Sequence, residues 1–291
     1  MTFIDILEQF NIEYREHGQH EHTTSGWVNI DCPFCSKGWE HYRLGFNINY
    51  GYMSCWSCGP KKMVNVLTEI TGQQRSVIYA LVKDLDKSEI PEEFSVRGKL
   101  VYPKYVGILN NSHHKYLKSR GLDPYTMSQL WKVQGIGVSP THAWRLFIPI
   151  YYKGEVVSWT TRSIKPDAKL RYKAAEAKCE KINHHHLLYG EDYARNTIIV
   201  CEGPVDVWKI GPGSVCTCGL AYSRQQVARI ARYPTRYICF DSEPEAQAKA
   251  NKLANDLSVL DGNTFNVVLD SGKDPGSADK KELEQLRRLL A

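Results

Sequence analysis

The stretch TIIVCEGPVDVWKIG, residues 197–211, decides the fold of the last third of the chain. It begins as an apolar, largely β-branched run of strand length and continues in a helical pattern, with an acidic residue at the junction. Three more apolar runs of strand length follow, separated by helix-patterned segments such as 244–260. This alternation predicts an α/β domain with a mostly parallel sheet. The expected strands are 197–201, 215–217, 236–240 and 265–269.

Acidic side chains follow the expected strands at their carboxyl ends. Glu202 ends the first strand, and Asp206 comes one helical turn later. Asp241 and Glu243 end the third strand, and Asp274 follows the fourth. Each close pair of such charges repels by roughly 4 kcal/mol at an effective dielectric constant near 20. The arrangement would therefore destabilise the fold if it had only a structural role. The pattern indicates a site for Mg²⁺ or Mn²⁺, because hard cations take carboxylate oxygens and bring phosphates with them.

Two pairs of cysteines near the N-terminus have the spacing of zinc knuckles. CPFC supplies Cys32 and Cys35, and CWSC supplies Cys55 and Cys58. Four thiolates around one ion leave no open position for water, which predicts structural zinc. The residues between the pairs alternate in polarity, with glycines at the turns, which indicates a β-hairpin and hence a zinc ribbon. The other cysteines lack this pairing and are expected in the core: Cys179, Cys201, Cys216, Cys218 and Cys239.

Aromatic and basic residues surround the two knuckles, and a ribbon this small cannot bury all of them. Such a mixture suits stacking on unpaired bases with a phosphate contact nearby. The alternative is that Tyr52 and Trp56 cap the ribbon core. The candidates for template recognition are His41, Tyr42, Arg43, Tyr52 and Trp56.

Positive charge is concentrated in the middle of the chain. Residues 1–90 carry 8 basic and 11 acidic residues, residues 91–195 carry 17 and 9, and residues 196–291 carry 12 of each. A polyanion such as nucleic acid or a nucleotide would be drawn to the middle third, although a solvated lysine-rich surface has the same composition. The expected parts are a ribbon at 1–85, a charged linker at 86–97, a basic region at 98–195 and the acidic α/β domain at 196–291.

Length and composition exclude several classes of protein. The 291 residues, 42% of them hydrophobic, exceed one small module and are not those of a disordered chain. No apolar run approaches the ~20 residues of a membrane span. Asp5 and Glu8 interrupt the N-terminal apolar stretch, which predicts a short amphipathic helix and not a signal peptide. We therefore expect a cytoplasmic protein with no membrane partner. GxxxxGK[ST] does not occur, so we expect no helicase motor.

Three segments resemble the acidic motifs of a TOPRIM domain: CEGPVDVWKIG (201–211), CFDSEPEAQAKANKLA (239–254) and LDSGKDPGSAD (269–279). A zinc ribbon and a basic region ahead of them make the chain similar to a DnaG-type DNA primase, and in particular to the primase half of short-tailed-phage primase-helicases. RLFIPIYYKGEVVSWTTRSIKPDAKLRYK (145–173) resembles the basic N-terminal subdomain of that family's RNA polymerase core. LLYGEDYARN (187–196) resembles the stretch that leads into TOPRIM. The implied fold class is α/β for the basic subdomain and the TOPRIM domain, and α+β for the chain as a whole.

The resemblance implies roles for the acidic residues. Glu202 takes the position of a metal ligand or general base, with Asp206 as its neighbour. Asp241 and Glu243 match the family's DxD pair, and Asp274 matches its later metal-binding aspartate. The sequence departs from the family at Glu243, where aspartate is usual, and a serine replaces the frequent glycine inside the pair. We expect this departure to alter metal preference more than activity.

The resemblance also implies an activity, which is synthesis of short RNA primers on single-stranded DNA by metal-dependent nucleotidyl transfer in phage or mobile-element replication. The implied cofactors are structural Zn²⁺ and catalytic Mg²⁺ or Mn²⁺. The implied partners are template, ribonucleoside triphosphates, the RNA primer and a replicative helicase as a separate protein. Guanidinium and ammonium groups would contact phosphates, or else lie on a solvated surface. The candidates are Arg145, Arg162, Arg171, Lys173 and Lys273.

Two other classes of function remain open. A TOPRIM nuclease uses similar carboxylates to cleave strands but has little need of a start-site ribbon. A recombination mediator combines a zinc ribbon with TOPRIM and polymerises nothing, although the basic middle region counts against it. Dependence on nucleotides separates the three classes, because a primase makes new oligonucleotides, a nuclease shortens the template, and a mediator does neither.

Overall fold

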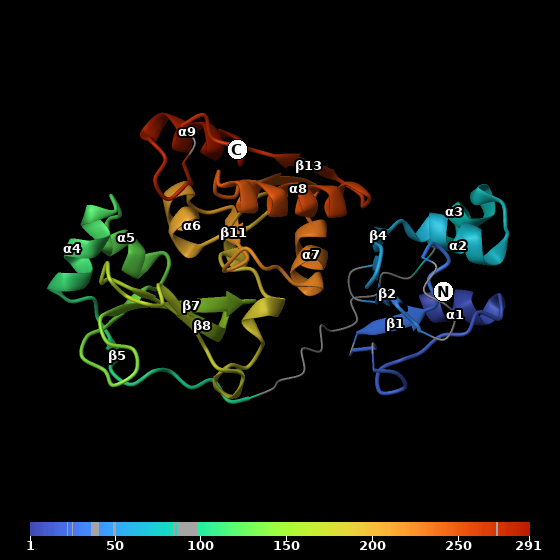
Figure 1. Cartoon of the computed structure of the whole chain (residues 1–291), viewed down its shortest axis with the longest axis horizontal. Coiled ribbons are helices and arrows are strands. Elements are labelled where there is room, and N and C mark those ends of the chain that lie inside the picture. The colour runs from blue at the N-terminus through green and yellow to red at the C-terminus, as the bar shows by residue number, and fades with distance from the viewer. Residues whose placement is uncertain are drawn as a thin grey trace. The chain divides into compact units, whose positions relative to one another are not determined.

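The computed structural model describes residues 1–21, 23–24, 26–35, 41–48, 51–83, 85, 98–271 and 273–291 (Figure 1). The chain divides into two compact units, and each is described by itself. The linker expected at 86–97 lies outside the described residues. Within the described ranges, no helix is both long enough and apolar enough to cross a membrane.

The first unit is a four-stranded antiparallel sheet accompanied by three helices. The strand order is β1-β2-β3-β4, and each neighbouring pair is antiparallel. Strands β2 and β3 form the hairpin expected between the two knuckles, and this register sets Leu44 opposite Cys55. The elements are α1 (Phe3–Gln9), β1 (Trp27–Ile30), β2 (Leu44–Asn47), β3 (Tyr52–Cys55), β4 (Gly59–Lys61), α2 (Met63–Thr71) and α3 (Arg75–Lys83).

Helix α1 confirms the expected amphipathic N-terminus. It begins after Thr2, whose hydroxyl accepts the Asp5 amide N–H while the Asp5 carboxylate accepts the Thr2 N–H. This reciprocal pair satisfies two backbone donors that the first helical turn leaves free. The apolar face of α1 closes the core of the first unit, which also contains buried side chains of the sheet and of α2 and α3. That core includes Phe3, Ile6, Leu7, Leu44, Met53, Leu67 and Ile78.

The second unit contains a five-stranded antiparallel sheet in the order β5-β6-β7-β8-β9. Its longest pair is β7 with β8, an antiparallel hairpin that carries Arg145 on the first strand and Arg162 on the second. Most positions of both strands are buried, because helices and the second sheet of the unit cover them. The elements are β5 (Val106–Gly107), α4 (Asn111–Ser119), α5 (Pro124–Gln129), β6 (Gln134–Ile136), β7 (Arg145–Tyr152), β8 (Glu155–Ser163) and β9 (Tyr172–Ala174).

The second unit also contains a four-stranded sheet in which every neighbouring pair is parallel, as the sequence predicts. The order is β11-β10-β12-β13. The strand of this sheet that comes first in the sequence, β10, therefore lies between the second strand, β11, and the third, β12. Ligands of open parallel sheets bind where the strand order reverses in this way, outside the carboxyl ends of the strands. The strands are β10 (Thr197–Cys201), β11 (Ser214–Cys216), β12 (Thr235–Ile238) and β13 (Asn263–Asn266).

The expected strand boundaries were right for β10 and shifted for the others. Strand β13 was expected at 265–269 but begins two residues earlier, because the polar residues Asn263 and Thr264 pair with β12. Figure 1 shows helices around this sheet. They are α6 (Pro204–Ile210), α7 (Arg224–Ala231), α8 (Pro244–Ser258) and α9 (Lys280–Arg288), and the short 3-10 helices η1 (Ala177–Cys179), η2 (His184–His186) and η3 (Glu191–Tyr193) precede β10.

Candidate functional site

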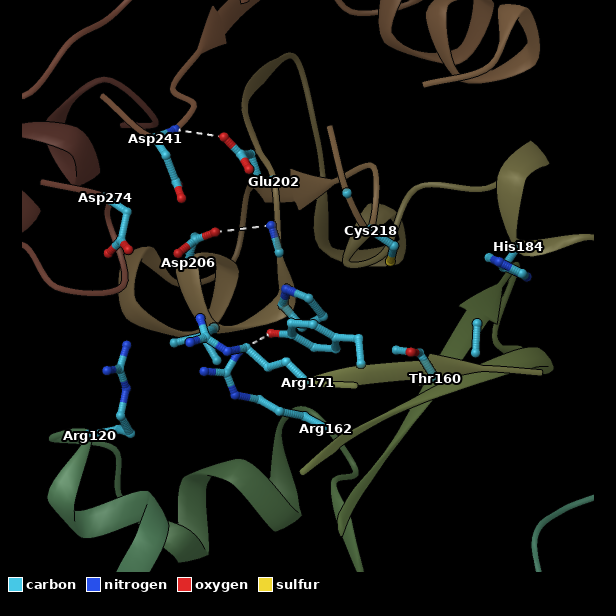
Figure 2. Close-up of a pocket in the computed structure, with 16 residues that line it drawn as sticks. Arg120, Thr160, Arg162, Arg171, His184, Glu202, Asp206, Cys218, Asp241 and Asp274 are labelled. Carbon is cyan, nitrogen blue, oxygen red and sulfur yellow. Dashed lines mark hydrogen bonds between the residues drawn. The ribbon is translucent and has the colours of Figure 1, made fainter. Parts of the chain in front are cut away.

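A cavity of about 470 Å³ opens between the two sheets of the second unit. One wall is acidic and consists of Glu202, Asp206, Asp241 and Asp274, which Figure 2 shows gathered at one side. Glu202 follows β10, Asp206 lies in the first turn of α6, Asp241 follows β12, and Asp274 lies in the loop after β13. The parallel sheet therefore brings together four of the five expected acidic residues. Glu243 is exposed and does not line the cavity.

Hydrogen bonds to main-chain amides hold the acidic wall in place. The Glu202 carboxylate accepts the Asp241 N–H at 2.9 Å, which ties the ends of β10 and β12 together. One carboxylate oxygen of Asp206 accepts the Gly203 N–H and the other accepts the Gly276 N–H, both at 3.0 Å. Asp206 thus joins the loop after β10 to the loop that carries Asp274. Its two oxygens are already engaged, so its geometry is that of a positioning residue.

The glycine at position 276 permits this close approach. A Cβ atom built on Gly276 would lie 2.7 Å from the Asp206 Oδ1 atom, a separation that real Cβ contacts do not reach. Only a residue without a side chain can therefore donate its N–H to Asp206 from this position.

Burial raises the pKa of each carboxyl group in the centre of the wall. Removal from water is the largest cause, and repulsion by the neighbouring carboxylates adds to it. The pKa values rise to about 7 for Glu202, about 7 for Asp206 and about 6 for Asp241. The buried Oδ1 atom of Asp274 has no hydrogen-bond partner among the described residues. An oxygen-rich wall with mutual repulsion and an orphaned acceptor fits a divalent cation such as Mg²⁺ or Mn²⁺.

The opposite wall of the cavity is basic. Arg162 of β8 is buried, and its guanidinium donates to the Tyr116 hydroxyl at 2.6 Å and to the Tyr172 hydroxyl. These neutral partners fix the orientation of Arg162 without cancelling its charge. Arg171, in the turn before β9, lines the same wall and is exposed. Both residues were expected to contact phosphate, and the structure brings them into the cavity.

Arg120 also belongs to the basic wall, and the sequence did not single it out. It lies directly after α4, donates to the Gly276 carbonyl at 3.3 Å, and keeps a buried Nε atom without a partner among the described residues. In the sequence it is one of several basic residues along a helical pattern, so no local signal separates it from a surface charge. Within the described ranges, no ion pair joins the three arginines to the acidic wall.

Three other expected phosphate contacts lie outside the lining of the cavity, as far as the described residues show. Arg145 is buried and donates to the main-chain carbonyls of Leu170 at 2.6 Å and Arg171 at 3.2 Å. It holds the turn that carries Arg171, and the expected phosphate contact by Arg145 stays a prediction. Lys173 is half-buried and Lys273 is exposed.

The cysteines outside the knuckles divide into two groups. Cys201, Cys216 and Cys239 are buried as expected. Cys179 is partly buried and packs against the core around Ile136, whereas Cys218 is partly buried and differs from the expected core position. Cys218 lines the cavity, because it lies beyond β11 in a left-handed backbone conformation that takes the chain out of the sheet.

We expect Asp241→Asn to raise the melting temperature at pH 8 in the absence of divalent cations. The folded-state pKa of about 6 lies above the unfolded value near 3.9, so the charge destabilises the fold above pH 6, and this cost disappears towards pH 4. The expected gain is about 1 kcal/mol, or roughly 2–4 °C. Calorimetry at pH 8 and pH 4 measures it, with exposed Asp270→Asn as the control. Equal shifts at both pH values would contradict the electrostatic account.

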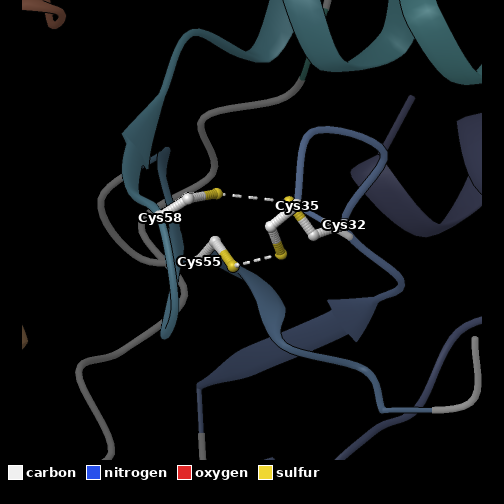
Figure 3. Close-up of side chains that lie close together, drawn as sticks. All are labelled: Cys32, Cys35, Cys55 and Cys58. Carbon is white, nitrogen blue, oxygen red and sulfur yellow. Dashed lines mark hydrogen bonds between the residues drawn. The ribbon is translucent and has the colours of Figure 1, made fainter. Parts of the chain in front are cut away.

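The four cysteines of the knuckles converge in the first unit, as Figure 3 shows. Their sulfur atoms lie within 4.8 Å of one another, with 3.5 Å between Cys32 and Cys58 and 3.7 Å between Cys35 and Cys55. A zinc ion with Zn–S bonds of about 2.3 Å has tetrahedron edges of about 3.8 Å. The cluster therefore fits one structural zinc ion, and the antiparallel strands around it make the unit a zinc ribbon.

The residues expected around the knuckles differ in exposure. Tyr42 and Tyr52 are each 3% exposed, so neither ring is open for stacking on a base, and Tyr52 fits the alternative that it caps the ribbon core. Tyr42 packs under the Arg15 guanidinium and beside His20, while strand β3 turns Tyr52 onto Trp27. His41 is exposed, Arg43 is half-buried and Trp56 is 56% exposed.

Phe34, inside the first knuckle, is 43% exposed and was not expected at the surface. The Lys61 ammonium lies 6.0 Å from the centre of its ring. CPFC and CWSC each contain one aromatic residue, and this shared feature is the sequence signal that could have predicted an exposed Phe34. Each knuckle thus presents one exposed aromatic ring, Phe34 or Trp56.

We expect Cys58→Ser to release zinc and to unfold the first unit. A structural zinc site contributes on the order of 10 kcal/mol to the folding of a small module, and three thiolates hold the ion less tightly than four. Metal analysis by mass spectrometry should find one zinc per chain in the unaltered protein and near none in the variant. Cys179→Ser, which alters a partly exposed cysteine outside the cluster, should keep its zinc. Full zinc content in Cys58→Ser would exclude this site.

Comparison with known proteins identifies the fold. No protein-family model matches the sequence, and no curated protein matches it. The structure is similar to the zinc-binding and RNA polymerase domains of the Aquifex aeolicus primase, with TM-score 0.54, 17% identity, and coverage of 100% of this chain and 82% of that one.

Two catalytic cores of other bacterial primases are also similar. The RNA polymerase domain of Mycobacterium tuberculosis primase DnaG matches with TM-score 0.52 and 19% identity over 62% of this chain and 76% of that one. The E. coli primase catalytic core matches with TM-score 0.50 and 16% identity over 61% and 72%. The chain therefore has the fold of primase zinc-binding and RNA polymerase domains. The short-tailed-phage relationship stays a prediction.

Proposed function

We propose that the protein is a DNA primase that synthesises short RNA primers on single-stranded DNA. The observation that carries the proposal is one cavity with a carboxylate wall and a guanidinium wall, in a chain with the fold of primase zinc-binding and RNA polymerase domains. A nucleoside triphosphate bound with divalent cations complements both walls, because its phosphates suit the arginines and the cations suit the carboxylates. The cavity volume of about 470 Å³ is within the range of small-ligand sites.

The acidic wall would hold the catalytic cations through Glu202, Asp241 and Asp274. The cation, when bound, polarises the α-phosphate and makes the attacking 3′-hydroxyl more acidic. Glu202 and Asp241 keep their geometry through the hydrogen bond between them, and Asp206 holds the loop of Asp274 by way of Gly276. Glu243 lies two positions after Asp241 in the sequence and is exposed. It would therefore assist cation binding only through its charge.

The basic wall would bind the triphosphate. Arg162 and Arg120 are oriented by neutral partners and keep their full charge for the ligand. A guanidinium grips phosphate with two parallel hydrogen bonds, which fixes the reacting phosphorus relative to the acidic wall. Arg171 is exposed at the rim and would neutralise the outer phosphates or the template backbone. Lys173 and Lys273 remain candidates for template contacts outside the cavity.

The zinc ribbon would read the start site on the template. The exposed rings of Phe34 and Trp56, with His41 and Arg43 nearby in sequence, supply stacking surfaces and a cation for unpaired bases. The proposed parts of the chain remain the ribbon at 1–85, a linker at 86–97, the basic subdomain at 98–195 and the TOPRIM subdomain at 196–291. A replicative helicase is the proposed protein partner.

The test is incubation with a library of single-stranded DNA, labelled ribonucleotides and Mg²⁺ or Mn²⁺, with products resolved by length and sequenced. We expect short new RNAs that start at a shared template motif. Asp241→Asn should abolish synthesis because it removes a charge from the cation site, whereas Asp270→Asn, an exposed carboxylate after the same sheet, should not.

Other results of the same assay would reject the proposal. Shortened template would make the protein a nuclease, and intact template without product under both metals would favour a binding protein such as a recombination mediator. Synthesis by the Asp241→Asn variant would show that the catalytic site lies outside this cavity.

A further inference from the structure

The end of the cavity away from the carboxylates has a different chemistry. Figure 2 shows His184 and Thr160 at the side of the cavity opposite Asp241 and Asp274, with Cys218 between. The described side chains that line this end include no carboxylate and no guanidinium, and they offer a hydroxyl, a thiol and an imidazole. If the phosphates of a nucleotide face the arginines, its nucleoside occupies this end.

His184 is held in one orientation by a buried carboxylate. Glu180 is 2% exposed, and its Oε2 atom lies 3.0 Å from the His184 Nδ1 atom and accepts the His184 amide N–H at 3.0 Å. The same oxygen accepts the Ser158 hydroxyl at 2.7 Å. Burial alone would raise the pKa of Glu180, but these hydrogen bonds outweigh it and lower the pKa below its ordinary value. Glu180 is therefore an acceptor, and the Nδ1 atom of His184 carries a proton.

The other ring nitrogen of His184 is consequently available to a ligand. With Nδ1–H directed at Glu180, Nε2 accepts a hydrogen bond from a ligand hydroxyl when the ring is neutral and donates one to it when the ring is protonated. Nε2 has no partner among the described residues, and His184 lines the cavity. The buried Thr160 side chain lines the same end. An imidazole nitrogen beside a hydroxyl suits a ligand that carries hydroxyl groups, as a ribose does.

We propose that His184, positioned by Glu180, forms a hydrogen bond through Nε2 with the 2′-hydroxyl of the bound nucleotide and thereby selects ribonucleotides over deoxyribonucleotides. This inference rests on the proposed function, because it requires nucleotide phosphates at the arginine wall. A site built to hydrogen-bond a hydroxyl discriminates against the analogue that lacks it, since the analogue leaves the buried partner unpaired. His184 is then a specificity-determining residue.

The experiment measures equilibrium binding of ATP and of 2′-deoxyATP to the full chain with Mn²⁺, in the unaltered protein and in three variants. His184→Phe keeps the ring and removes its nitrogens, and His184→Gln restores an acceptor. His185→Phe is the matched control, because His185 stacks on His184 with ring centres 4.2 Å apart but is exposed and does not line the cavity.

We expect the unaltered protein to bind ATP about tenfold more tightly than 2′-deoxyATP, the loss that one hydrogen bond to a buried partner produces. In His184→Phe, affinity for ATP should fall to that for 2′-deoxyATP, whose own affinity should not change. His184→Gln should recover part of the preference, and His185→Phe should retain all of it.

Two results would overturn the inference while leaving the proposed function in place. One is an unchanged preference for ATP in His184→Phe, and the other is an equal loss of affinity for both nucleotides, which would indicate a contact with the base or the 3′-hydroxyl. Absence of nucleotide binding by the unaltered protein would overturn the inference and the proposed function together.

Discussion

Repulsion among four carboxylates at one edge of a parallel sheet is the constraint on which the structure of the second unit depends. Glu202, Asp241 and Asp274 lie close together on one wall of the cavity, and burial raises the pKa of the first two. The fold tolerates this cost because main-chain N–H groups and Asp206 fix the loops that carry them. A divalent cation bound between these carboxylates would offset the repulsion.

The antiparallel sheet places positively charged side chains opposite the carboxylates. Strand β8 and the turn before β9 bring Arg162 and Arg171 to the opposite wall, and Arg120 reaches it from the end of α4. Tyrosine hydroxyls orient Arg162 and a main-chain carbonyl orients Arg120, and among the described residues none of the three arginines forms an ion pair with the acidic wall. The buried arginine at 145 acts one step further away, because it holds the turn on which Arg171 lies. A ligand with both phosphates and cations satisfies the two walls together.

The features that the sequence predicted well are those encoded within a short segment. The C-x-x-C pairs, the alternation of strands and helices, and the acidic residues after strands all depend on local spacing, and the parallel sheet brings those acidic residues together by topology alone. Exposure and long-range pairing are not encoded locally. The sequence therefore did not decide whether Tyr42 and Tyr52 are buried, and it did not mark Arg120 and His184 as cavity residues, because only the packing of distant elements decides their surroundings.

Manganese binding, followed by electron paramagnetic resonance of the free ion, tests most directly the claim that the acidic wall is a cation site. The full chain, with zinc already bound at the ribbon, should remove Mn²⁺ from solution, and ATP should strengthen the binding because its phosphates occupy the arginine wall. Asp241→Asn should weaken binding at least tenfold, the change that 1.4 kcal/mol produces. An undiminished signal of free Mn²⁺ with the unaltered protein, with and without ATP, would contradict the account.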